Sequence, residues 1–305
     1  MLNLPSFQLE RPDTMRDLLG LAHAPDTRII AGGTDLLPNL KHRIEKAQTL
    51  VALHQVPSLR GVHETEDGLT IGPMTTLSEI AASEEISSRY PALSAATQTI
   101  GTSTIQEMGT IGGNIMLDTR CKYLNQPAGW RKAIGGCLKC DGNVCHVART
   151  SHNCYATNSA DTVPVLWLMG ASLAFHSLEG ERRVLLSDFY KDDGIDRFAL
   201  KRGEILTSIH LPKPRGFVAH RKLRLRGAID YPLLLCAVRR EGGGATAVLS
   251  AIGPKPIFVQ ADKASELPEA AWAAAKPLNT HLASTSWRKH MVRVEVSRAL
   301  EETIR

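Results

Sequence analysis

The sequence has no segment that would export the chain or anchor it in a membrane. Its first residues, Met1–Glu10, lack both the basic start and the apolar core of a secretory signal peptide. No uncharged apolar run approaches the roughly 18 residues that a membrane span needs. We therefore expect a cytoplasmic protein with no membrane partner. A reducing compartment also disfavours disulfide bonds.

The sequence is equally poor in features of nucleic-acid binding and of hydrolysis. The net charge is only +5 and aromatic residues make up 5% of the chain, with no basic stripe interleaved with aromatics, so we expect no nucleic-acid partner. The chain has no Walker lysine, no HExxH motif and no evident Ser-His-Asp set. What remains is an ordinary globular composition, with 43% hydrophobic residues among 305, enough for two or three domains.

Cysteines are unevenly distributed along the chain. Only Cys236 lies outside one short window. That window holds the other five cysteines, which are Cys121, Cys137, Cys140, Cys145 and Cys154. Thiols gathered in this way in a chain without a secretion signal usually hold a metal or a metal cluster. The window from Asp118 to Thr157 has little periodicity and is predicted to be a long loop, and loops of that length are usually functional.

The first fifty or so residues are predicted to form a βαβ unit. A helix capped by Asp13 or Thr14 precedes a buried strand at 27–30, and a glycine turn then leads into a helix at 36–46. A second strand at 49–53 completes the unit, with parallel strands expected.

The rest of the chain is predicted to form a larger α+β part and a small C-terminal one. Asp67-Gly68 favours a hairpin, Thr76 caps a helix, and 204–211 is predicted to be an edge strand ending at Pro212. We expect a two-part domain at 1–213, with its parts at 1–55 and 56–213, and a C-terminal α+β domain at 214–305. Its predicted elements are strands near 217–225 and 245–251, a helix or strand at 233–238 and a helix at 286–304.

Two glycine-rich turns are candidates for binding phosphate. Ala31–Leu36 lies between a strand and a helix, and Gly109–Asn114 is a second turn of the same kind. Glycine allows close approach of a ligand to the backbone, and amides at a helix start favour phosphate. A plain strand-to-helix turn explains either one alone, and neither has the Rossmann spacing. Together they define a candidate dinucleotide site.

These segments resemble a known family. Ile30–Pro38 and Gly109–Asn114 are similar to the two FAD-binding segments of the medium flavoprotein subunit of the xanthine oxidase and carbon monoxide dehydrogenase family. Ser159–Asp161 resembles that family's contact to the flavin nucleotide. Lys222 and Arg226, before Asp230-Tyr-Pro, resemble the start of its C-terminal domain. The motif order is kept over nearly the whole chain.

The resemblance implies a fold and a set of FAD contacts. The fold is α+β: a two-part FAD-binding domain, followed by a C-terminal domain with a three-stranded antiparallel sheet and helices. The FAD-binding residues implied are Ala31, Gly32, Gly33, Thr34, Asp35, Leu36, Leu37, Thr102, Thr110, Gly112, Gly113, Asn114, Asp161 and Lys222.

The cysteine window interrupts this FAD-binding pattern. Asn114 and Asp161 stand 47 positions apart, whereas the family pattern has about ten, so an insertion of roughly 37 residues, about 117–157, is implied. It resembles the insertion of one branch, the β subunits of 4-hydroxybenzoyl-CoA reductases, which binds a [4Fe-4S] cluster. That resemblance implies Cys121, Cys137, Cys145 and Cys154 as ligands. Spacing alone favours Cys137-x-x-Cys140 and leaves a four-thiolate zinc site open.

The resemblance also implies a function. It predicts the FAD- and [4Fe-4S]-containing electron-transfer subunit of a molybdenum-dependent 4-hydroxybenzoyl-CoA reductase, with no residue of its own acting on the substrate. The implied partners are a small subunit with two [2Fe-2S] clusters, a large molybdenum-cofactor subunit and reduced ferredoxin as donor, in a dimer of heterotrimers. Two alternatives remain: the FAD subunit of an oxidising molybdenum hydroxylase, and a zinc-stabilised binding module.

Overall fold

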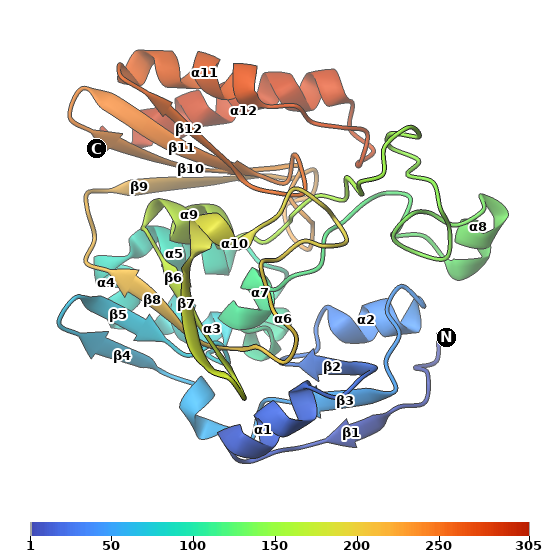
Figure 1. Cartoon of the computed structure of the whole chain (residues 1–305). Coiled ribbons are helices and arrows are strands. Elements are labelled where there is room, and N and C mark those ends of the chain that lie inside the picture. The colour runs from blue at the N-terminus through green and yellow to red at the C-terminus, as the bar shows by residue number, and fades with distance from the viewer. Residues whose placement is uncertain (1, 305) are drawn as a thin grey trace.

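The structure is a computed structural model that describes residues 2–304, and it contains three β-sheets (Figure 1). The N-terminal sheet has the strand order β1-β3-β2 and is parallel throughout. The βαβ prediction is therefore confirmed, although the helix after the first glycine turn ends at Lys41 because the chain turns at Arg43, where φ is +58°. The elements are β1 (Gln8–Glu10), α1 (Met15–Ala22), β2 (Thr27–Ile30), α2 (Leu36–Lys41) and β3 (Thr49–Ala52).

The second sheet is antiparallel and has five strands in the order β4-β5-β8-β6-β7. The prediction of an edge strand at 204–211 was wrong, because β8 pairs with β5 on one side and β6 on the other. Pro212 is tolerated there because it is the last residue of β8, so it interrupts no interior pairing. The strands are β4 (Val62–Thr65), β5 (Gly68–Ile71), β6 (Ser172–Ser177), β7 (Gly180–Leu185) and β8 (Ile205–Pro212).

Short helices pack beside this sheet and build the main hydrophobic core. The predicted cap at Thr76 is confirmed as a capping box, in which Thr76 Oγ1 accepts from the Glu79 amide and the Glu79 carboxylate accepts from the Thr76 amide. The core joins Ile71, Leu93 and Phe175, all fully buried. The helices are α3 (Leu77–Ala82), α4 (Glu84–Arg89), α5 (Pro91–Gln98), α6 (Ser103–Met108), α7 (Ile111–Ile115), α9 (Val163–Leu168) and α10 (Leu186–Phe189), with a 3₁₀ turn η1 (Pro57–Leu59).

The C-terminal sheet has four antiparallel strands, in the order β12-β11-β10-β9, with two helices packed on it (Figure 1). The prediction of a three-stranded sheet was therefore wrong by one strand. The additional strand, β12, is only five residues long and follows a run rich in glycine, proline and lysine. Its pattern was therefore too short to predict a strand. The elements are β9 (Val218–Leu223), β10 (Leu234–Glu241), β11 (Gly244–Ser250), β12 (Ile257–Ala261), η2 (Ala264–Glu266), α11 (Leu267–Ala274) and α12 (Thr285–Glu302).

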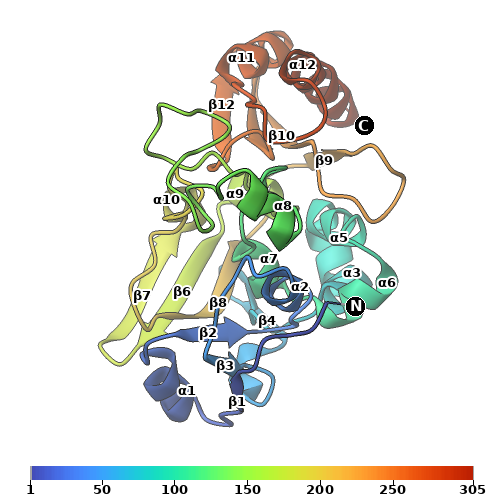
Figure 2. The same ribbon diagram turned by 90° about the vertical axis from the view of Figure 1, so that its right-hand side faces the viewer.

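The cysteine window is a long loop, as predicted, with one short helix, α8 (Ala128–Ala133). Its two ends meet in a bridge between Arg120 and Thr157. Figures 1 and 2 show it next to α2, where buried Arg131 donates to the carbonyl of His42 at 2.7 Å. On its other side the Lys122 amide donates to the Thr280 carbonyl at 2.7 Å. The loop thus connects the N-terminal and C-terminal parts.

No helix within residues 2–304 combines the length and the apolar character needed to cross a bilayer.

Candidate functional site

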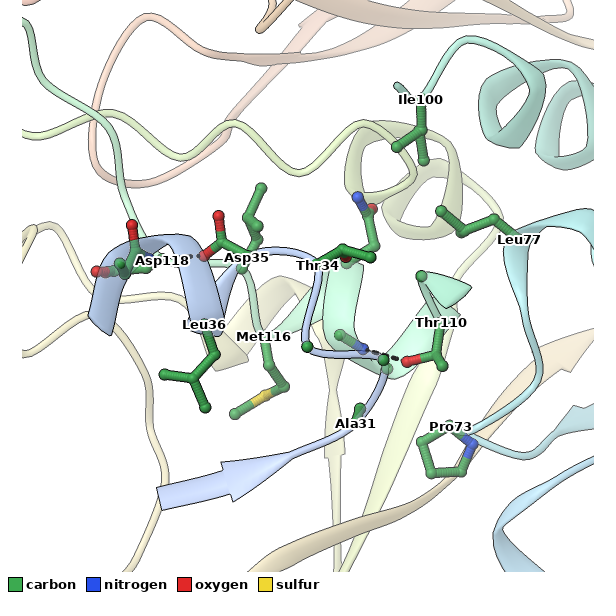
Figure 3. A pocket seen from close by; sticks show the side chains of 18 of the residues that line it. Ala31, Thr34, Asp35, Leu36, Pro73, Leu77, Ile100, Thr110, Met116 and Asp118 are labelled. Carbon is green, nitrogen blue, oxygen red and sulfur yellow. Dashed lines mark hydrogen bonds between the residues drawn. The ribbon is translucent and has the colours of Figure 1, made fainter. Parts of the chain in front are cut away.

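A cavity of about 660 Å³ is lined by all three parts of the chain. Both glycine turns line it and lie beside each other (Figure 3). Its volume falls within the usual range for a small-molecule or cofactor site. The residues expected to bind FAD that line it are Ala31, Gly32, Gly33, Thr34, Asp35, Leu36, Thr110, Gly112, Gly113, Asn114, Asp161 and Lys222.

The glycines are needed because the turns pack tightly against backbone. A Cβ atom on Gly32 would overlap the carbonyl oxygen of Met108, just before the second turn. A Cβ on Gly112 would lie 2.7 Å from the carbonyl oxygen of Pro73. The sequence predicted that glycine would admit a ligand. The structure shows that glycine also brings the two turns together, because any side chain would push them apart.

Polar side chains of the second turn are used to hold its own shape. Thr110 Oγ1 accepts a hydrogen bond from the Gly113 amide at 3.0 Å and so caps α7. Asn114 Oδ1 accepts from the Thr162 hydroxyl at 2.7 Å and from the Thr162 amide at 3.1 Å. Asn114 therefore fastens α7 to the start of α9, across the whole inserted loop.

Asp161 and Lys222 form an ion pair at the cavity wall. Lys222 Nζ lies 2.6 Å from Asp161 Oδ1, and their side chains are only 4% and 6% exposed. Burial raises the pKa of Asp161 to about 6, and the neighbouring Lys222 ammonium acts in the opposite direction. Lys222 also donates to the Thr99 carbonyl at 3.0 Å. The pair fixes β9 of the C-terminal part onto the flavin-side wall.

The inserted loop contributes charged residues that sequence reasoning missed. Arg120 forms an ion pair with Asp35 of the first glycine turn, and its guanidinium lies 4.5 Å from the ring centre of Tyr231. Asp118 lines the cavity together with Arg197, whose Nε lies 3.4 Å from Asp118 Oδ1. Nothing in the spacing indicated these contacts, because they join segments far apart in the chain.

Arg197 provides a test of whether the cavity suits an anionic cofactor. Its buried Nε makes no hydrogen bond among the residues that the structure describes, although the Asp118 carboxylate lies 3.4 Å away. Lys222 and Arg226 are further cationic residues in the lining. Leu77, Ile100 and Met116 add an apolar wall, visible in Figure 3. Cationic groups for a pyrophosphate and an apolar wall for a flat ring system together fit FAD.

Two of the expected FAD residues lie outside the lining. The side chain of Leu37 packs beneath Gly33, at 3.2 Å from the position that a Cβ there would take. Thr102 Oγ1 accepts from the Ile105 amide at 3.3 Å and caps α6. Contacts of these two residues to FAD stay predictions.

Four cysteines of the inserted loop line a second, much smaller cavity of about 20 Å³. They are Cys121, Cys137, Cys145 and Cys154, each no more than 9% exposed. The walls between them are mostly apolar, with Leu124, Leu138 and Ala156. Within residues 2–304, however, no three His, Cys, Asp or Glu side chains stand close enough to hold a single metal ion. All six cysteines are free thiols.

Cys140 is not part of this cavity. Its Sγ faces the Arg43 carbonyl oxygen at 3.7 Å and the Asp141 carboxylate at 3.5 Å. Cys137 lines the cavity and Cys140 does not, although the two residues belong to the same buried cluster, so the cavity does not favour the Cys137-x-x-Cys140 pair that the spacing indicated. Cys236 is fully buried in the C-terminal core.

Burial favours the protonated form of two of the cavity thiols, Cys121 and Cys154. Burial raises the pKa of Cys154 to about 11 and also raises that of Cys121. Binding of a cation would therefore have to displace the protons, because the thiolate is the form that ligates metals. Four thiols in an apolar setting are the donor set that an iron–sulfur cluster uses, whereas no three of them within the described residues stand close enough for a single metal ion.

Comparison with known proteins identifies the family. The family described as the FAD binding domain in molybdopterin dehydrogenase matches residues 5–214. The FAD-binding subunit PaoB of an aldehyde oxidoreductase from Escherichia coli K12 is 29% identical over 271 residues, 85% of each chain. The xanthine dehydrogenase FAD-binding subunit of Escherichia coli O157:H7 is 27% identical over 310 residues, 92% of each chain.

Solved structures share the fold over the full chain. A chain of reconstituted CO dehydrogenase from Oligotropha carboxidovorans superposes with a TM-score of 0.79 at 25% identity, covering 99% of this chain and 98% of that one. A chain of the carbon monoxide dehydrogenase from Hydrogenophaga pseudoflava gives 0.80 at 21% identity, with the same coverage. The predicted α+β fold class is confirmed. The chain belongs to the family of FAD-binding domains of molybdopterin dehydrogenases.

Proposed function

We propose that the chain is the FAD- and [4Fe-4S]-containing electron-transfer subunit of a molybdenum-dependent 4-hydroxybenzoyl-CoA reductase. The observation that carries this proposal is the four-thiol cavity within the inserted loop, placed beside the flavin cavity. A metal centre that exchanges electrons with FAD bound to the same chain must lie close to the flavin. Arg120, the residue before Cys121, forms an ion pair with Asp35 of the first glycine turn, so the inserted loop directly contacts the lining of the flavin cavity.

The residues of the chain have distinct roles in this proposal. FAD, when bound, would hold up to two electrons and exchange them one at a time, and the cluster would exchange single electrons with it. Lys222, Arg226 and Arg197, each beside a carboxylate, would provide the cationic part of the lining for the pyrophosphate, and the two glycine turns would shape the cradle around it. Cys121, Cys137, Cys145 and Cys154 would hold the cluster, while Cys140 stays a free thiol.

The proposal includes an assembly. The partners are a small subunit with two [2Fe-2S] clusters and a large molybdenum-cofactor subunit, in a cytoplasmic dimer of heterotrimers. Reduced ferredoxin is the proposed donor, and the electrons leave toward the partner subunits. The bond changes in the aromatic substrate belong to a partner, which agrees with the lack of a hydrolytic motif in this chain.

A second function is favoured by the names of the relatives. They include subunits of an aldehyde oxidoreductase, a xanthine dehydrogenase and a carbon monoxide dehydrogenase. In an oxidising hydroxylase of this kind, electrons would reach FAD from the molybdenum side. The inserted thiol cavity supports the first function over this one, because an additional one-electron centre is useful where electrons enter from a one-electron donor.

Metal analysis of the anaerobically purified chain tests the cluster. We expect FAD together with roughly four iron and four sulfide per chain. Cys145→Ser should lose iron and keep FAD, because it removes a cavity thiol without touching the flavin walls. Cys140→Ser is the matched control and should keep both. A colourless protein that contains zinc, or iron loss only in the Cys140 variant, would contradict the assignment.

Activity of the assembled complex tests the reaction. The chain should copurify with its two partners, and the complex should reduce 4-hydroxybenzoyl-CoA to benzoyl-CoA with reduced ferredoxin. Oxidation of an aldehyde or of xanthine with an artificial acceptor, without any aryl-CoA reduction, would instead establish the second function.

A further inference from the structure

A buried chain of charges connects the flavin cavity with the four-thiol cavity. Asp118 and Arg197 line the flavin cavity, and Lys139 lines the thiol cavity. Lys139 Nζ donates to Asp118 Oδ1 at 2.5 Å, and the two side chains are each 8% exposed. Figure 3 shows Asp118 on the flavin side, near Asp35. The Lys139–Asp118 pair therefore lies between the two cavities.

The ammonium of Lys139 is held in one place by three acceptors. Besides Asp118, it donates to the Thr119 hydroxyl at 2.6 Å and to the Gly194 carbonyl at 2.8 Å. The adjacent Asp118 carboxylate, in an ion pair with Lys139, favours the charged form of the amine. Three short contacts use all three N–H donors of the ammonium, so its position is fixed.

Gly194 contacts both the Lys139 ammonium and the Cys154 thiol. A Cβ on Gly194 would be 2.8 Å from Cys154 Sγ, so the backbone that binds Lys139 also touches this sulfur. The Gly194 amide donates to the Cys154 carbonyl at 2.7 Å. Lys139 and Cys154 also line the same small cavity, so the charge lies close to the thiol.

We infer that Lys139 is a positioning residue that raises the reduction potential of the centre in the four-thiol cavity, with Asp118 acting in the opposite direction. This inference depends on the proposed [4Fe-4S] function of that cavity. Four thiolates give the bound centre a net negative charge, which grows by one when it accepts an electron from a low-potential one-electron donor. A fixed buried cation stabilises the more negative form, and a fixed buried anion destabilises it.

A merely structural role predicts a different pattern. If Lys139 only tied the loops together, removing either partner would loosen both cavities and move the potential the same way or release iron. An electrostatic role predicts shifts of opposite sign for the two partners. Lys139→Gln should lower the potential, and Asp118→Asn should raise it.

Redox titration of the chain, monitored by electron paramagnetic resonance, measures the reduction potential of the cluster. At a fixed ambient potential we expect the oxidised-to-reduced ratio of the cluster to rise about tenfold in Lys139→Gln, a shift of about 59 mV for one electron. Asp118→Asn should change the ratio by a similar factor in the opposite direction. Lys139→Arg keeps the charge and should restore most of the wild-type ratio.

Lys132→Gln is the matched control, because it removes the same charge from an exposed site on α8 of the same loop. It should leave the ratio unchanged. Equal shifts in Lys132→Gln and Lys139→Gln, or shifts of the same sign in the Lys139 and Asp118 variants, would overturn the inference. If Lys139→Gln does not retain iron, the Asp118→Asn and Lys139→Arg titrations decide it. Absence of iron and sulfide from the wild-type chain would overturn the proposed function itself.

Discussion

The two cavities of this protein are built in different ways. The flavin cavity lies at the ends of regular elements, where glycine turns after β2 and before α7 pack directly on neighbouring backbone. The thiol cavity lies inside a loop with one short helix, and its walls are mostly apolar, with Lys139 among the lining residues. The first is shaped by the folded scaffold. The second is held by a few long-range contacts, so its stability should depend on what it binds.

Because of this difference, substitutions at the two cavities should have effects of different extent. Damage to the glycine turns should reach the whole FAD site, because two segments must separate to admit even a methyl group. Damage to the inserted loop should remain local, because the loop adds contacts to a fold that the relatives share over nearly their full length.

Replacing Gly32 with alanine should have the largest effect. The new Cβ would overlap the Met108 carbonyl oxygen, so the two turns must move apart and the FAD cradle opens. We expect loss of bound FAD and a decrease in the free energy of unfolding on the order of 4 kcal/mol. Flavin absorbance after desalting and urea unfolding measure both. Gly20→Ala is the control, because a Cβ there meets no atom within 4 Å. Retention of FAD in Gly32→Ala would refute the packing argument.

Replacing Gly194 with alanine should affect only the thiol cavity. Its Cβ would lie 2.8 Å from Cys154 Sγ and 3.0 Å from the Ala156 amide nitrogen, so the thiol must shift. We expect reduced iron content at unchanged FAD content, with an overpacking cost of about 2 to 3 kcal/mol. Iron and flavin assays separate the two cavities. Gly129→Ala lies in the same inserted loop in open space and should retain iron. Simultaneous loss of FAD would show that the cavities are not independent.

The anchor of the inserted loop on the C-terminal part should weaken at low pH. His281 Nε2 lies 3.3 Å from Thr157 Oγ1, and burial chiefly lowers the His281 pKa to about 4, helped by nearby Arg288. The unfolded chain takes up this proton near pH 6.5, before the folded chain does. Stability is therefore fully present above pH 6.5 and falls as the pH decreases toward 4.

The expected loss from His281 is about 2 kcal/mol at pH 5, from the difference between the two pKa values. His281→Gln should flatten the dependence of unfolding free energy on pH between 7 and 5. His220, also buried with a pKa lowered to about 4, contributes a similar slope and remains in the variant. An unchanged slope in His281→Gln would show that the histidine does not titrate with folding.

Much of the fold followed from local pattern. The parallel βαβ unit and the cap at Thr76 could be predicted, because caps, turns and apolar periodicity act over a few residues. The central position of β8 and the strand β12 could not. Which strand lies at an edge depends on partners distant in sequence, and a five-residue strand after a proline-rich run has little pattern of its own.

The sequence by itself determined the two glycine turns, the inserted loop and the supply of thiols, because these depend on residue type and order. Only the tertiary structure decided which thiols share a cavity, and it turned Cys140 toward Arg43 instead. It alone also placed Arg120 on Asp35 and Lys139 on Asp118. The physical reason is that burial and charge pairing act through space, between segments whose spacing along the chain carries no trace of the contact.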